Sequence, residues 1–126
     1  MNFIIFLEPV TKKNHQQIWR NAKTGRPFIQ QSDFYKRYET ECMYALNKVR
    51  GVRINQPVNV KCLFYKSTKR QCDLTGLLQS IDDILVKAEV LTDDNFNIVA
   101  GHDGSRVLID RKNPRTEITI DYLEEK

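Results

Sequence analysis

Two neighbouring segments with different apolar spacings constrain the fold of this 126-residue chain most. In the first, apolar side chains at every second position predict a strand with one buried face, formed by Val58, Val60, Cys62 and Phe64. In the second, from residue 74 to about 89, spacings of three and four predict a helix with one apolar stripe, formed by Leu74, Leu77, Leu78, Ile81, Ile84, Leu85 and Ala88. A strand and a helix that each have one apolar side are expected to pack in layers.

The rest of the chain repeats this mixture of strands and helices. Ser32 can cap the first turn of another helix, whose apolar stripe continues to a stop near Gly51. Residues 11 to 25 hold no period and are expected to form a polar, basic loop or hairpin. Further strands are predicted over 2–7, 27–30, 96–100, 106–110 and 117–122, with His102-Asp103-Gly104-Ser105 as a hairpin turn between 96–100 and 106–110. This order predicts an α+β fold with two helices packed on one mixed β-sheet.

Length and composition predict a single domain over residues 1–126, with one modest core. The first apolar stretch, residues 3 to 7, is too short for a membrane span and lacks the flanks of a secretory signal. We therefore expect a cytoplasmic protein that has no membrane partner. Three cysteines leave an odd thiol under any pairing, and none has the spacing of a zinc ligand, so reduced thiols are expected.

The charge of the chain is unevenly distributed. Residues 1 to 72 carry fourteen Lys and Arg against four Asp and Glu, whereas residues 73 to 126 carry six against twelve. The basic residues are spread over several predicted elements. In a folded domain they would create a surface field that attracts a polyanion, although scattered Lys and Arg also serve solubility alone.

Five aspartates lie on and around the predicted helix from residue 74. In a basic chain, they suggest a Mg²⁺ site that faces a phosphate backbone. Each also has an ordinary structural interpretation, as a helix cap (Asp73), a solvated helix residue (Asp82, Asp83) or a turn former (Asp93, Asp94). Because the helix would be about 24 Å long, Asp73 and Asp94 can meet only if the chain after Val90 folds back along it.

Four motifs follow one another in the second half of the chain: Lys69-Arg70-Gln71-Cys72-Asp73-Leu74-Thr75-Gly76-Leu77, Asp83-Ile84-Leu85-Val86-Lys87-Ala88, Val90-Leu91-Thr92-Asp93-Asp94 and Pro114-Arg115-Thr116-Glu117-Ile118. In order and spacing they resemble the RusA family of Holliday junction resolvases. That family typically shows a basic lead into D-L-D-N-L, a D-A-L helix, a D-D pair and a terminal P-R-x-E-I strand. The resemblance spans roughly residues 57 to 122.

The resemblance implies a small homodimeric endodeoxyribonuclease, of phage or prophage origin, that acts in DNA recombination and repair. It would cut four-way DNA junctions, one strand per subunit, by hydrolysis assisted by Mg²⁺, with Mn²⁺ as an alternative ion. Asp73 matches the first catalytic, metal-binding aspartate of the family, and Asp94 matches the last. Asp83 matches the aspartate of the D-A-L motif.

The chain departs from the family at positions that matter for the metal. Thr75 stands where the family has its second aspartate, Gln79 where it has a lysine, and Gly76 where it has an asparagine. A threonine hydroxyl is a much weaker Mg²⁺ ligand than a carboxylate. Asp83 is therefore the expected third catalytic carboxylate, with Asp82 as its alternative and Asp93 in a supporting or turn position.

Contacts with DNA are expected from basic residues on two segments. Lys69 and Arg70 come just ahead of Asp73, and Lys12 and Lys13 form a second basic pair, so all four are predicted phosphate contacts unless they are simply solvated. Trp19 and Phe28 could stack on exposed bases, but packing roles are more common for such residues. His15 and His102 are far apart in the sequence, and we assign them no role.

Three functional interpretations remain open at this point. The first is a structure-selective nuclease that resolves four-way junctions. The second is a DNA-junction-binding protein of the same fold, in which cleavage is weakened or lost through Thr75 and Gln79. The third is an unrelated α+β domain that binds RNA or another protein.

Overall fold

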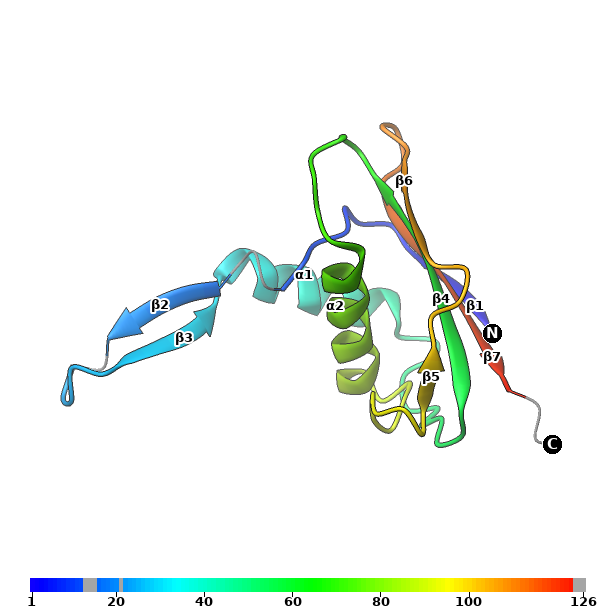
Figure 1. The fold of residues 1–126 in the computed structure, drawn as a ribbon, viewed down its shortest axis with the longest axis horizontal. Coiled ribbons are helices and arrows are strands. Elements are labelled where there is room, and N and C mark those ends of the chain that lie inside the picture. Colours follow the sequence, from blue (N-terminus) through cyan, green and yellow to red (C-terminus); the bar gives the residue numbers. More distant parts are fainter. Residues whose placement is uncertain (13–15, 21, 124–126) are drawn as a thin grey trace.

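The computed structural model describes residues 1–12, 16–20 and 22–123, and for residues 16–20 and 28–31 it gives the backbone alone. In chain order the elements are β1 (Asn2–Ile5), β2 (Gln16–Arg20), β3 (Pro27–Gln31), α1 (Asp33–Ala45), β4 (Val58–Lys66), α2 (Leu74–Lys87), β5 (Val99–Gly101), β6 (Arg106–Ile109) and β7 (Arg115–Tyr122). Both helices lie on one side of a mixed five-stranded sheet, while the β2–β3 hairpin extends away from it (Figure 1). The predicted α+β class, with two helices on one mixed sheet, is confirmed.

The central strand of the sheet is β4, which pairs along both of its edges. One edge pairs with β7 in antiparallel register, and β7 in turn pairs with β1. The side chains of Val58, Val60, Cys62 and Phe64 are fully buried, so the predicted inward face of this strand is confirmed. The sheet therefore presents one apolar face to the helices.

The other edge of β4 corrects the predicted hairpin. Both β5 and β6 pair with β4 in parallel, β5 near Val58 and β6 from Leu63 onward, and they do not pair with each other. The turn between them does form: the amide of Ser105 donates to the carbonyl of His102 at 3.1 Å, and Gly104 has a φ of 87°. After this turn the chain continues along the same edge of β4. The nine-residue strand β4 is long enough to pair first with β5 and then with β6.

The first helix begins as predicted and ends earlier. The hydroxyl of Ser32 accepts a hydrogen bond from the amide of Tyr35 at 3.1 Å, which is the expected cap. Helix α1 ends at Ala45, not near Gly51, and turns follow it. Leu46 is nevertheless buried. The apolar stripe thus outlasts the helix, since turn residues can also reach the core.

The second helix packs its apolar stripe into the same core as α1. Leu77, Ile81, Ile84 and Leu85 are almost fully buried. The hydroxyls of Tyr35 and Ser80 share a buried hydrogen bond of 2.7 Å, which joins α1 to α2. Among the described residues, no helix is long and apolar enough to cross a membrane.

Candidate functional site

Asp73 occupies the residue that immediately precedes α2. Its backbone is extended, with φ of −86° and ψ of 128°, as expected for a helix cap. Its carboxylate nevertheless makes no capping hydrogen bond, and the side chain is exposed. The loop that leads into it carries Lys69 and Arg70, both also exposed. The start of α2 therefore combines a solvent-facing carboxylate with two exposed cations on the preceding loop.

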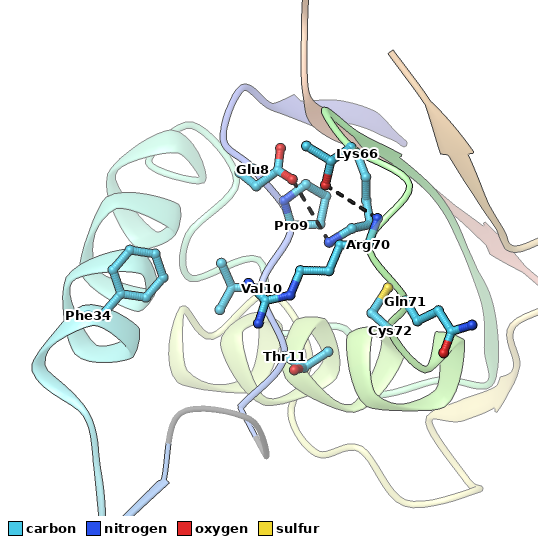
Figure 2. Close-up of a pocket in the computed structure, with 10 residues that line it drawn as sticks. Glu8, Pro9, Val10, Thr11, Phe34, Lys66, Arg70, Gln71 and Cys72 are labelled. Atoms are coloured by element: carbon cyan, nitrogen blue, oxygen red, sulfur yellow. Dashed lines mark hydrogen bonds and ion pairs between the residues drawn. The ribbon is translucent and has the colours of Figure 1, made fainter. Parts of the chain in front are cut away.

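A groove lies next to this loop. It encloses about 520 Å³ and is lined by Glu8, Pro9, Val10, Thr11, Phe34, Lys66, Thr68, Arg70, Gln71 and Cys72. Its walls come from the segment after β1, the first turn of α1 and the chain between β4 and α2 (Figure 2). We call it the Arg70 groove, because the side chain of Arg70 extends into it toward Val10.

One carboxylate fixes the base of the loop that forms this groove. Glu8 accepts hydrogen bonds from the amide of Ser67 at 3.1 and 3.3 Å, and its carboxylate lies 3.9 Å from the ammonium of Lys66. The hydroxyl of Thr68 accepts from the amide of Arg70 at 3.4 Å. These contacts hold the wall of the groove and neutralise the charge of Lys66.

The middle of α2 holds a buried carboxylate whose partner is a histidine. The Nε2 atom of His102 donates to the carboxylate of Asp82, with distances of 2.9 and 3.1 Å to the two oxygens. Asp82 is only 8% exposed. Hydrogen bonding to Asp82 raises the pKa of His102 above its usual value. This pair joins α2 to the turn after β5, and it contradicts the interpretation of Asp82 as a solvated residue.

Asp83 also has a partner within the chain. Its carboxylate lies 3.2 Å from the ammonium of Lys12, and the two side chains are 26% and 30% exposed respectively. A predicted metal ligand and a predicted phosphate contact thus form an ion pair with each other. Lys13, the other basic residue predicted in that segment, lies outside the described residues.

The aspartate pair after α2 has two different environments. Asp93 accepts from the amide of Asp94 at 2.7 Å and from the side-chain amide of Asn95 at 2.9 Å. These bonds, the backbone one first, lower the pKa of Asp93 and mark it as a turn former. Desolvation, the hydrogen bond with Asp93 and the charge of Asp83 raise the pKa of Asp94.

Asp73 lies apart from Asp83, the other predicted catalytic carboxylate on this helix. Asp73 and Asp83 are ten residues apart on or beside one helix, which separates them by about 15 Å along its axis. In the sequence, Asp94 follows Lys87, the last residue of α2, by seven residues, and the charge of Asp83 acts on it. The chain does fold back as β5, but the residue that it brings to α2 is His102.

A Mg²⁺ ion requires several oxygen ligands at one point. Within the described part of the chain, no three His, Cys, Asp or Glu side chains lie together in a way that could hold a metal ion. Thr75 and Gln79 are both exposed on the first turns of α2. The described residues of one chain therefore do not fit a complete magnesium site.

The pair formed by Asp82 and His102 was not predicted, although one signal for it was present. Asp82 follows Leu78 by four residues and precedes Leu85 by three, so it lies on the same helical stripe as these buried residues. A carboxylate on an apolar stripe needs a partner, because an unpaired buried charge is costly. The spacing could have indicated burial, but not which residue would pair with it.

No model of a known protein family matches the chain, and no curated protein matches it either. What the structure establishes is an arrangement: an exposed carboxylate beside two cations at the start of α2, a groove next to them, and partnered carboxylates further along the helix.

Proposed function

We propose that this protein is an endodeoxyribonuclease of the Holliday junction resolvase type, which uses Mg²⁺ and acts on four-way DNA junctions in recombination and repair. The observation that carries the proposal is the start of α2, where Asp73 has an exposed carboxylate with no capping role, three residues after Arg70. The four sequence motifs and the basic first 72 residues support it. Because one chain does not gather the carboxylates, the cofactor rests on the resemblance alone.

The basic residues of the loop would bind the DNA backbone. Lys69 and Arg70 are exposed, and a phosphate can accept from both side chains without displacing a carboxylate partner in the described structure. Each phosphate contact releases counterions from DNA, so affinity should fall steeply as salt rises. Such contacts would bring the sugar-phosphate backbone to the side of α2 on which Asp73 lies.

A second candidate is a junction-binding protein that does not cut. One specific observation favours it: no three metal-ligating side chains of the described residues lie together, and Thr75 supplies no charge where the family has its second aspartate. This alternative keeps the same DNA-binding residues and predicts salt-sensitive, structure-selective binding without hydrolysis.

The deciding experiment is cleavage of an end-labelled four-way junction in Mg²⁺, with a duplex of the same arm sequence as competitor. We expect paired nicks across the junction, and we expect Asp73→Asn and Asp94→Asn to abolish them. Asp121→Asn, an exposed aspartate on β7, is the matched control and should cut normally. Tight junction binding without nicks would favour the second candidate, whereas no salt-sensitive binding to any DNA would exclude both.

A homodimer is part of the proposal. A four-way junction presents two equivalent strands, so a two-fold dimer can place one chain on each. Light scattering after size exclusion, with and without the junction, should give the mass of two chains. A monomer at micromolar concentration in both conditions would contradict this part of the proposal.

A further inference from the structure

The Arg70 groove has the size of a site for one small ligand. Ligand sites commonly enclose about 300 to 1,000 Å³, and this groove encloses about 520 Å³. It is therefore too small for a DNA duplex, but it can hold one nucleotide that has left its stack.

The two walls of the groove differ in chemistry. One wall holds the apolar residues: Pro9 and Val10 are buried, and the ring of Phe34, 56% exposed, stands on the first turn of α1. Glu8 and Thr11 flank Pro9 and Val10 on the same segment, and the Glu8 carboxylate is held by Lys66 and the amide of Ser67. The opposite wall is polar and carries Lys66, Thr68, Arg70 and Gln71. A nucleotide has the same division, with a flat base that stacks on apolar or aromatic groups and a phosphate that binds cations.

The cations of the polar wall are not equivalent. Lys66 lies 3.9 Å from Glu8 and is compensated by it. In the described structure, Arg70 forms no ion pair, and its side chain extends into the groove (Figure 2). A guanidinium can bind a phosphate through two parallel hydrogen bonds or stack on a base. Arg70 is therefore the cation that remains available to a ligand.

The position of the groove connects it with the proposed substrate. Arg70 precedes Asp73 by three residues, so the Cα atoms of the two residues are at most about 11 Å apart, and the groove adjoins the segment that carries the exposed carboxylate. At the centre of a branched DNA, the bases next to the branch point are those that unstack most readily.

We propose that the Arg70 groove binds one unpaired nucleotide of the DNA substrate, with its base against Phe34 and Val10 and its phosphate on Arg70. This inference rests on the proposed binding of branched DNA and does not depend on cleavage. It gives the protein a means to select DNA in which a base can leave the duplex.

The test is a cycle that combines a change in the protein with a change in the DNA. Binding is measured for a duplex with a single-nucleotide bulge and for the same duplex with an abasic analogue at the bulge. Stacking on an aromatic side chain is worth about a 5- to 150-fold change in affinity. The affinity of the wild-type protein should fall by that factor when the base is removed, whereas the Phe34→Ala variant should bind both DNAs with equal affinity. Phe96, which follows α2 and is 81% exposed, provides the control. The affinity of the Phe96→Ala variant should fall by the same factor as that of the wild type when the base is removed.

The results separate the inference from the proposed function. Equal binding of both DNAs by wild-type protein, or an unchanged loss in Phe34→Ala, would overturn the nucleotide site even if junctions are cut. If the protein shows the expected binding differences but never cuts DNA, the nucleotide site is supported and only the proposed nuclease activity is contradicted. Arg70→Gln should lower the affinity for the bulged DNA and for the abasic DNA by the same factor, since it removes a phosphate contact. A loss of affinity only for the DNA that keeps the base would contradict the phosphate role of Arg70.

Discussion

The carboxylates at the start and in the middle of α2 differ in burial and in their partners. At the start, Asp73 is exposed and makes no capping bond, and the cations before it belong to the same loop. In the middle, Asp82 is buried against His102, and Asp83 pairs with Lys12. A buried carboxylate needs a partner for the fold to be stable, whereas an exposed one does not. Asp82 thus serves the fold, Asp83 has a partner within the chain, and Asp73 makes no ion pair with any described residue.

The largest expected effect concerns the start of the helix. Asp73→Asn preserves shape and removes one charge, so it should lower the rate of junction cutting by about 100-fold or more, as expected for a group that stabilises charge in the transition state. The free energy of unfolding should change by less than about 0.5 kcal/mol, because the side chain is exposed. Rate assays and urea titrations measure both quantities. If Asp73→Asn lowers the stability but still cuts, Asp73 contributes to the fold and not to cleavage.

The next effect concerns the buried pair. Asp82→Ala removes the partner of His102 and should lower the free energy of unfolding by about 2 kcal/mol at a pH where His102 is charged. Urea unfolding followed by circular dichroism provides the measurement, and Asp121→Ala is the exposed control. A change as small as that of the control would mean that the pair adds nothing to stability.

The same pair predicts a dependence on pH. Since Asp82 raises the pKa of His102 in the folded state, the folded chain holds that proton more tightly than the unfolded chain. The stabilisation is therefore complete below the ordinary histidine pKa of about 6.5, and it is lost as pH rises through the higher pKa of the folded state. The difference in unfolding free energy between wild type and His102→Gln should shrink over that interval. A constant difference would contradict the assignment to this pair.

The smallest effect distinguishes a paired lysine from a loop lysine. Lys12→Gln removes the ion pair with Asp83 and should cost about 0.5 kcal/mol of stability, with the salt dependence of DNA binding unchanged. Lys69→Gln should leave stability unchanged and reduce the slope of log affinity against log salt by about one. Equal slopes for the two variants would show that Lys12 leaves Asp83 when DNA binds.

Local patterns predicted the parts of the fold that depend on local chemistry. The alternation in β4 and the capping hydroxyl of Ser32 are properties of neighbouring residues, and both are confirmed. The prediction of a hairpin after α2 was wrong, because the turn sequence specifies a turn but not the strand with which the next residues pair. The pairing depends on β4, about forty residues earlier in the chain, whose long edge pairs with both β5 and β6.

The candidate site was predictable to a similar extent. The position of Asp73 at the start of α2 and the basic residues before it follow from a short run of sequence, whereas its lack of a capping hydrogen bond does not. The partners of Asp82 and Asp83 are 20 and 71 residues away, and pattern does not reveal such distances in space. The Arg70 groove was also missed, because it joins three segments that have no common motif.

The central place of β4 determines which amide protons exchange most slowly with solvent. Its backbone is hydrogen-bonded along both edges, to β7 on one side and to β5 and β6 on the other, and its inward side chains are fully buried. Such amides can exchange only when the whole domain opens, so their protection measures the global stability of the protein. The amides of β2 and β3 belong to a separate two-stranded sheet and should exchange through a local opening of that hairpin.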